Sequence, residues 1–390
     1  MSAKKILAIL LIIVLFLFYL SNISSINTID ELAYVIGLGF DTSENGKLKL
    51  SLQISLPSSY SSNGGGSSSS SENTTVITSV DCNSIDSGIN LANTYVGKTL
   101  NLSYCKAVIF SEQLAQKGII SYVSTLINDI EVRPYCKILV SKCNASDFLK
   151  NSKPLLDNLS SKYYDSAETS EKNTGFTRIV TLLDFYNDYY DTCSDSFTML
   201  GTIDDSLSED DTVKMSGLVS FHNGSLSGEL TPSEVLSNLI TSNELKHAII
   251  SIPSPFSDSD YISLYISNSK SKNDVKIVNG FPFIKCNITL STRILSNSVN
   301  SNYMSDENIS AIEKYASSYF KSHIENYLYK TSTTLKSDVS KFGKIAIKHF
   351  KTWNDWTEYD WLDKYQNSFF DVNVNVKLKS SYLVIGASKS

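Results

Sequence analysis

An apolar run near the amino terminus constrains the whole chain. It extends from Ile6 to Leu20 and follows the basic residues Lys4 and Lys5. Because a helix rises about 1.5 Å per residue, this run and its neighbours approach the ~30 Å hydrocarbon core of a bilayer. The sequence therefore predicts a membrane anchor over residues 1–25. Its lipid-facing residues are expected to include Ile6, Leu10, Ile13, Leu17 and Leu20.

Two interpretations of this segment remain open: a cleaved secretory signal and a retained anchor. A cleavable signal needs a small-residue site soon after the apolar run, and residues 20–25 supply it only poorly. A lipoprotein signal needs a cysteine directly after the run, but the first cysteine is Cys82, so we expect no lipidation. The basic residues before the run predict an inner amino terminus, which places the chain from about Ser21 onward outside the cytoplasm.

The remainder of the chain is acidic and long enough for about two to three domains. The whole chain has 390 residues and a formal net charge of −6, with 34 Lys and Arg against 40 Asp and Glu. Without Lys4 and Lys5, 32 basic residues stand against 40 acidic ones, a charge of −8. Nucleic-acid binding calls for a basic stripe, so we expect no nucleic-acid partner. The six cysteines are widely spaced without a CxxC pair, which favours buried free thiols and leaves disulfides open.

Hydrophobic periodicity predicts mixed helices and strands in the first half of the chain. Residues 47–56 alternate as a half-buried strand, paired with residues 31–41 through a turn at Asn45 and Gly46. Gly37 and Gly39 lack a phosphate-loop pattern and indicate close backbone packing. Strands and helices then alternate from residue 75 to 149, which is typical of an α/β layer. The Ser- and Gly-rich residues 58–71 predict a flexible loop.

The second half predicts a hairpin, strands and a long helix. Residues 213–230 form two strands around an Asn-Gly turn, and residues 232–240 form a helix capped by Thr231. Residues 261–266 and 275–278 continue as two short strands. Ser305 is expected to cap a long helix, and residues 370–378 alternate as a closing strand that turns into a last strand over residues 382–385. The predicted fold class is α+β: an N-terminal membrane anchor followed by about three mixed α/β subdomains with mainly antiparallel sheets. The expected divisions are residues 1–25, 26–205, 206–280 and 281–390.

No group of residues indicates chemistry. The four histidines are isolated, and no HExxH, GxSxG, SxxK or P-loop pattern occurs. We therefore expect no catalytic residues, no metal, no cofactor and no enzyme activity. The aromatic and acidic residues 176–191 either line a ligand groove or form core with a solvated acidic edge, and we favour core. Lys341, Lys344 and Lys348 predict a solvated basic helix face.

Several segments resemble a known family. Residues 111–119, 130–133 and 137–142, with Glu31-Leu32 leading into Gly37–Asp41, are similar to the amino-terminal domain of the Ger(x)C family, the C subunits of spore germinant receptors. The long helix, Asp338 with Phe342-Gly343, the tryptophans from Trp353 to Trp361 and the closing strands resemble its carboxy-terminal domain. The family's lipidated cysteine is absent, because residues 26–28, beginning with Ile26, stand near the expected place.

The resemblance implies a non-enzymatic receptor subunit on the outer side of the spore inner membrane. It implies assembly with A and B subunits, in a complex that responds to a small-molecule germinant. The three tryptophans either form a partner surface or pack the helices onto the sheet, namely Trp353, Trp356 and Trp361. The alternatives are a membrane-tethered solute-binding protein that delivers a ligand to a transporter, and a surface enzyme.

Overall fold

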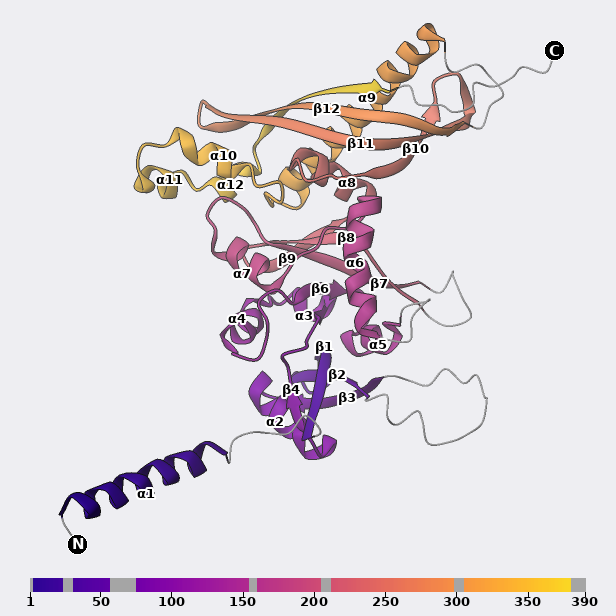
Figure 1. Ribbon diagram of the computed structural model, residues 1–390. Helices are drawn as coiled ribbons and strands as arrows, with labels where there is room; N and C mark the ends of the chain where they lie inside the picture. The colour runs from indigo at the N-terminus through magenta and orange to yellow at the C-terminus, as the bar shows by residue number, and fades with distance from the viewer. Residues whose placement is uncertain are drawn as a thin grey trace, which may run out of the picture.

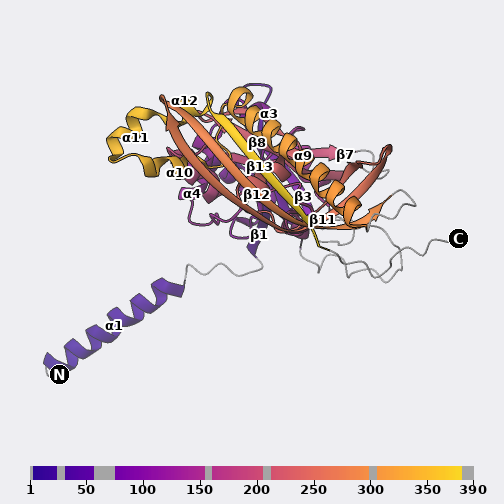
Figure 2. The ribbon, with the colours of Figure 1, turned by 90° about the horizontal axis from the view of Figure 1, so that it is seen from above.

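The structure is a computed structural model that describes residues 3–23, 31–56, 75–153, 160–204, 212–297 and 305–379. Two mixed sheets lie one above the other, with helices on and between them (Figure 1). Helix α1 (Ala3–Ile23) stands apart from both sheets in the two ribbon views (Figures 1 and 2). Among the residues whose side chains are described, no helix has the length and hydropathy needed to span a membrane.

The larger sheet has the strand order β3-β2-β1-β5-β6-β7-β8-β9, with β4 beside β1. Its strands are β1 (Leu32–Thr42), β2 (Leu48–Ser55), β3 (Thr75–Cys82), β4 (Thr99–Asn101), β5 (Ala107–Ser111), β6 (Lys137–Ser141), β7 (Phe197–Asp204), β8 (Thr212–His222) and β9 (Ser225–Leu230). The central strands β1, β5, β6 and β7 are parallel, and the outer pairs are antiparallel. The predicted α/β layer is therefore present, but the expectation of mainly antiparallel sheets is wrong for this sheet.

Helices cover both faces of the larger sheet. They are α2 (Ile85–Val96), α3 (Glu112–Ala115), α4 (Ile120–Asn128), α5 (Ala145–Asn151), α6 (Ser160–Thr174) and α7 (Leu182–Tyr190). Side chains from α5 and α6 form one apolar cluster with β5, β6 and β7, and side chains from α2, α3, α4 and α7 belong to the main core. Every residue of β5 and β6 is buried, as expected for parallel strands packed on two sides.

Strand β2 differs from its prediction because helix α5 covers its second face. Leu50 and Leu52 are buried as predicted, but Ser51 and Gln53 are buried too, so the strand is not half-exposed. The Gln53 side chain donates to the carbonyl oxygen of Leu149 in α5 at 3.1 Å. The helix can approach this closely because a Cβ atom at Gly37 would lie 2.8 Å from the Leu149 side chain. The predicted close packing at Gly37 is therefore confirmed.

The smaller sheet contains the carboxy-terminal strands in the order β10-β11-β12-β13. They are β10 (Ala248–Ser254), β11 (Ser257–Val278), β12 (Phe281–Asn297) and β13 (Phe369–Leu378). The first three are antiparallel, and β13 runs parallel to β12. The long predicted helix is α9 (Asp306–Tyr329). The Ser305 side chain caps its start and accepts from the Asn308 amide. Helix α9 runs beside β13 (Figure 2).

Short helices lie between the two sheets. They are α8 (Pro232–Thr241), a π-helical turn (Lys330–Thr334), α10 (Gly343–Ala346), a 3₁₀ turn (Ile347–His349), α11 (Trp353–Tyr359) and α12 (Trp361–Tyr365). Thr231 and Glu234 form the predicted cap of α8 as a capping box. The hairpin of β8 and β9 turns at Asn223 and Gly224, as predicted.

Some predictions fall outside what the structure describes or are not decided by it. Loop 58–71, Ile26 and a strand expected at residues 382–385 lie outside the described residues. The predicted boundary between residues 205 and 206 falls between β7 and β8, which pair within one sheet. The domain divisions remain predictions.

Candidate functional site

The three tryptophans do not form one exposed surface. Trp356 and Trp361 are each 1% exposed and stack on each other with ring centroids 6.0 Å apart, whereas Trp353 is 60% exposed. A partner surface that includes Trp356 and Trp361 is therefore wrong, because both rings pack in the core. The indole N–H of Trp356 donates to the Thr192 hydroxyl at 2.9 Å, which gives the buried ring its polar partner. Trp353 alone remains a candidate contact residue.

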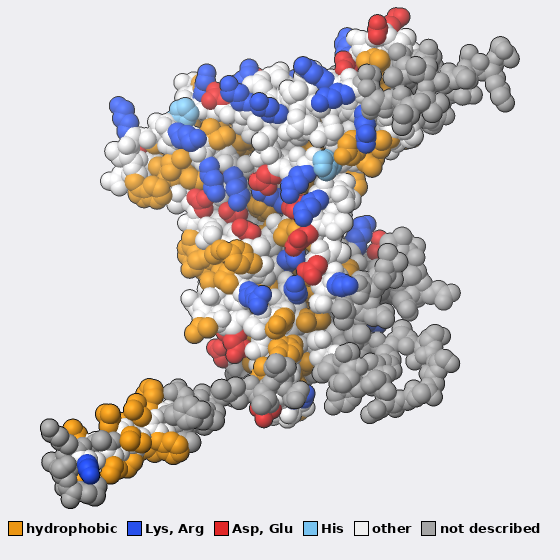
Figure 3. Space-filling model, in the orientation of Figure 1, with side chains coloured by type: hydrophobic (Ala, Val, Ile, Leu, Met, Phe, Trp, Pro, Cys, Tyr) orange, Lys and Arg blue, Asp and Glu red, His pale blue; other side chains and the backbone are white. Residues whose placement is uncertain are grey.

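The predicted anchor residues line the solvent-facing surface of α1. Ile6, Leu10, Ile13 and Leu17 are 53%, 58%, 52% and 59% exposed, and apolar side chains gather along the described part of the helix (Figure 3). The side chain of Leu20 lies outside the described residues. Exposed apolar side chains along a helix indicate a surface that contacts a membrane or a partner protein in the functional state.

A buried polar cluster joins the two sheets, and Asp338 is its centre. The segment after α9 places Asp338 at 0% exposure beside Cys193 to Ser196, which precede β7. Its carboxylate accepts from the amides of Phe342 and Gly343 at 3.1 and 2.9 Å and from the indole N–H of Trp361 at 2.9 Å. Burial raises the pKa of Asp338 to about 7, although these three donors lower it. The acid is therefore poised between its two charge states near neutral pH.

Asp195 connects this centre to the larger sheet. The Asp338 amide donates to its carboxylate at 3.1 Å, and the Asp195 amide donates to the Asp338 carbonyl at 3.4 Å. The Nδ1 atom of His222, at the end of β8, lies 3.4 Å from the other carboxylate oxygen. Burial raises the pKa of Asp195, and the carboxylate of Asp195 raises the pKa of His222. Protonation of these groups is thus coupled across the junction.

The predicted acidic edge and basic face meet at this junction. Asp188 of α7 is only 4% exposed, and the Lys341 ammonium donates to both of its carboxylate oxygens at 2.7 Å. Lys344 lies 3.4 Å from the carboxylate of Asp191. The expectation that both charged groups are simply solvated is therefore wrong for Asp188 and Lys341, which form an ion pair between sequence segments 153 residues apart.

A second branch of the cluster runs through α8. The Arg178 guanidinium, 7% exposed, donates to the Asn238 side chain at 2.9 Å and to Glu244 at 2.7 Å. The Asn238 amide group donates to the Tyr327 hydroxyl of α9 at 2.8 Å and to the Val339 carbonyl at 3.1 Å. Arg178, Asn238 and Tyr327 each have hydrogen-bond partners in this branch, and these bonds fix the position of the smaller sheet on the larger one.

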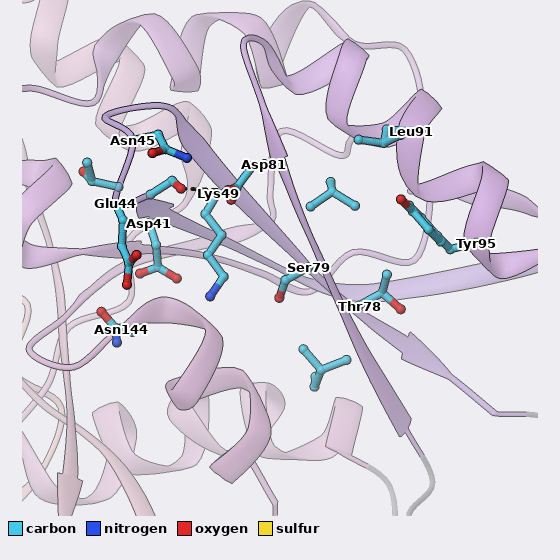
Figure 4. A pocket seen from close by; sticks show the side chains of 14 residues that line it. Asp41, Glu44, Asn45, Lys49, Thr78, Ser79, Asp81, Leu91, Tyr95 and Asn144 are labelled. Atoms are coloured by element: carbon cyan, nitrogen blue, oxygen red, sulfur yellow. Dashed lines mark hydrogen bonds between the residues drawn. The ribbon is translucent and has the colours of Figure 1, made fainter.

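Two hollows lie among the described residues, one at the junction and one at the amino-terminal strands. A cavity of about 260 Å³ at the junction is lined by Asp188, Asp195, Asn223 and Leu362. A larger open groove of about 950 Å³ lies where β1 and β2 meet beside β3 and α2, with Asp41, Glu44, Lys49, Asp81 and Tyr95 around it (Figure 4).

The groove contains charged groups of both signs, but its central acid has a structural role. The Asp41 carboxylate accepts from the amides of Ala145 and Ser146 at 2.7 and 3.0 Å and so caps the start of α5. Asp81 accepts from the Ser43 hydroxyl at 2.8 Å. Within the described residues no three His, Cys, Asp or Glu side chains are arranged to hold a metal ion. Neither hollow brings a nucleophile, a base and an orienting group together.

Sequence reasoning missed most of the junction. Asp338 stands out in the sequence only because its segment resembles the Ger(x)C carboxy-terminal domain. No local sequence pattern indicates a role at the junction for Asp195, His222 or Arg178. A polar residue inside an apolar segment is the one indication available, because a buried charge needs a partner supplied by the fold.

Family models match successive parts of this architecture. The family described as spore germination protein N-terminal domain matches residues 25–202, and the family described as spore germination B3/GerAC like, C-terminal, matches residues 216–382. The chain belongs to the Ger(x)C family. The second matched range begins inside β8, so the larger sheet of this Ger(x)C protein includes strands from both ranges.

Two individual proteins are similar to this chain over most of their length. The spore germination protein GerQC of Bacillus cereus is 21% identical over 360 residues, which cover 90% of this chain and 93% of that protein. The crystal structure of the GerBC protein superposes with a TM-score of 0.56 at 14% identity, covering 88% of this chain and 97% of that one. The GerBC likeness establishes a shared fold.

Proposed function

We propose that this chain is the C subunit of a spore germinant receptor, without enzyme activity, that assembles with A and B subunits. The observation that carries the proposal is the match of both Ger(x)C domains, in order, over residues 25–202 and 216–382. The ordered interface between the two sheets supports a single rigid unit, as expected of a subunit that binds partners through a fixed surface.

We further propose that α1 holds the chain at the outer side of the spore inner membrane. Its 21 residues correspond to about 32 Å of helix, its described apolar side chains are exposed, and Lys4 and Lys5 precede the apolar run. Tethering restricts the sheets to the membrane surface, which raises their effective concentration near membrane partners.

Co-purification tests both proposals. Tagged full-length chain is recovered from detergent-solubilised spore membranes, and mass spectrometry identifies its partners and its amino terminus. We expect an A-type subunit, a transporter-like B subunit and an intact segment from Ile6 to Leu20. A chain recovered alone and trimmed near Ser21 would overturn the receptor assignment and the anchor.

The exposed Trp353 provides a variant for the same experiment. If Trp353 contacts a partner, Trp353→Ser should lower partner recovery several-fold, because exposed tryptophans often carry interface energy. Tyr95→Ser is the matched control, since Tyr95 is an exposed aromatic residue on the opposite, amino-terminal part of the chain at 71% exposure. Equal recovery from both variants would remove Trp353 from the partner surface.

The solute-binding alternative predicts direct ligand binding by this chain. The open groove of about 950 Å³ is the place it would have to use. Calorimetric titration of the purified chain with germinants would detect such binding, and Glu44→Ala in the groove would be expected to weaken it.

A further inference from the structure

Two buried thiols lie in contact just before the start of the adjacent strands β5 and β6 of the larger sheet. The Sγ atoms of Cys105 and Cys136 are 3.5 Å apart, and these residues are 4% and 2% exposed. In the sequence they are 31 residues apart, which is too far for a motif to reveal. The other four cysteines are separate from this pair in the described chain, with Cys82 and Cys143 in contact with Leu48 and Ser141.

The backbone holds the two thiols in position from both sides. Cys136 immediately precedes β6 and Cys105 lies two residues before β5, and these strands pair in parallel from Ala107 and Lys137 onward. The Lys137 amide donates to the Lys106 carbonyl at 2.9 Å. The hydrogen-bonded pairing of the two strands therefore extends to Lys106, the residue between Cys105 and β5. By this register Cys136 lies opposite Lys106, which is one residue beyond Cys105. The contact between the two cysteines is therefore established by the 3.5 Å between their Sγ atoms.

We propose that Cys105 and Cys136 are a modification site, where a disulfide bond joins the starts of β5 and β6 when the chain folds outside the cytoplasm. The proposal rests on the extracytoplasmic location proposed above, because thiols oxidise there and stay reduced in the cytoplasm. Closing the bond needs the sulfur atoms to approach by about 1.5 Å, to the ~2.05 Å of a disulfide. Small χ1 rotations of both side chains provide such a movement.

The reaction is a thiol–disulfide exchange with an oxidised dithiol, a protein or small-molecule disulfide. Both S–H bonds break and one S–S bond forms; the two electrons and two protons pass to the oxidant, which leaves as two thiols. Burial raises the pKa of Cys136 well above its usual value, and the adjacent Cys105 thiol raises it further. The reactive thiolate is therefore scarce in the closed sheet, so exchange takes place before β5 and β6 close, during folding.

The bond would close a loop that contains β5, α3 and α4. This segment carries the central strand beside β1 and the apolar residue Ile130, which is fully exposed. A cross-link at the start of two adjacent parallel strands lowers the conformational entropy of the unfolded chain and so stabilises the folded sheet. It also holds together two strands whose pairing is non-local and therefore slow to form.

Disulfide mapping tests the proposal directly. Full-length chain from spore membranes is denatured and alkylated without reductant, then digested and analysed by mass spectrometry. We expect four alkylated cysteines and one linked peptide pair, Cys105 with Cys136, lighter by two hydrogens. Six alkylated cysteines, or a link that uses any other pair, would overturn it. Recovery of A and B subunits from the same preparation is a separate readout, so a failure of the receptor assignment is distinguishable.

A stability measurement provides the second test. Reductant should lower the thermal midpoint of the purified full-length chain by on the order of 5 °C, and should leave the Cys105→Ala/Cys136→Ala double variant unchanged. Cys286→Ala is the matched control, since Cys286 is fully buried in β12 and should keep the wild-type response. A midpoint that reductant lowers equally in the double variant would show that another bond is responsible. If the double variant does not fold, the mapping result decides.

Discussion

At the scale of single residues, the junction depends on one glycine. Gly343 starts α10 with its amide donating to the Asp338 carboxylate, and its backbone lies directly against Cys193 and the Trp361 ring. A Cβ atom there would overlap the Cys193 carbonyl oxygen and lie 2.7 Å from the indole nitrogen of Trp361. Neither neighbour is the free end of a flexible side chain, so the structure cannot relax around a methyl group.

We therefore expect Gly343→Ala to destabilise the protein by about 3 kcal/mol or more. Urea unfolding of the purified full-length chain, followed by circular dichroism, measures the change. Gly46→Ala is the matched control: nothing lies within 4 Å of its Cβ position and only its positive φ of 72° opposes a side chain, at a cost of about 1 kcal/mol. Equal losses of unfolding free energy in the two variants would show that the close contacts of Gly343 with Cys193 and Trp361 do not determine the cost of a side chain there.

The residue scale also shows where sequence reasoning stops. Local composition correctly indicated that residues 176–191 contain core aromatic residues and that Lys341 and Lys344 form a basic group. It could not show that Asp188 and Lys341 meet, because the pairing is produced by the way α7 and the segment after α9 come together. Long-range ion pairs follow from the fold and leave no periodic signal in either segment.

At the scale of elements, alternation predicted the strands and helices well, but it did not predict which faces they bury. The pattern of β2 indicated one buried face, and α5 covers the other because Gly37 and Gly39 let it approach. Pattern reasoning also divided β11 into two short strands, Tyr261–Ile266 and Val275–Val278. The polar residues between them belong to one strand that continues along β12, with register shifts near Leu264 and Asn268.

Helix α5 is the element that Asp41 holds in place from the end of β1. Removal of its carboxylate in Asp41→Ala leaves the buried amides of Ala145 and Ser146 without their acceptor. We expect a loss of about 2 kcal/mol, measured as a shift in the urea midpoint. Glu44→Ala, an exposed acid in the same groove, should change stability by less than about 0.5 kcal/mol. Similar effects of both variants would argue that Asp41 acts as a surface charge only.

At the scale of the whole molecule, the two sheets meet at titratable groups whose pKa shifts have one sign in common. Burial raises the pKa of Asp338 to about 7 and also raises the pKa of Asp188 and Asp195. The Asp195 carboxylate raises the pKa of His222. In each case the folded protein holds a proton more tightly than the unfolded chain does.

The contribution of these junction groups to folding stability should therefore fall as the pH rises from about 4 to 8. Between the unfolded Asp pKa of 3.8 and the folded value of about 7, the unfolded chain releases a proton that folded Asp338 retains, so unfolding becomes easier with each pH step. For Asp338 alone this amounts to on the order of 4 kcal/mol at most. Urea midpoints measured at pH 5, 6, 7 and 8 test the direction.

Asp338→Asn separates this residue from its neighbours. At pH 5 the variant should be less stable than the wild-type protein, because the NH₂ group of Asn faces a backbone N–H donor. Because the side-chain amide cannot ionise, the free energy of unfolding should then decline much less between pH 5 and pH 8. The decline that remains belongs to Asp188, Asp195 and His222. A variant that keeps the full wild-type slope would show that Asp338 is already ionised in the folded protein, and that its three hydrogen-bond donors outweigh its burial.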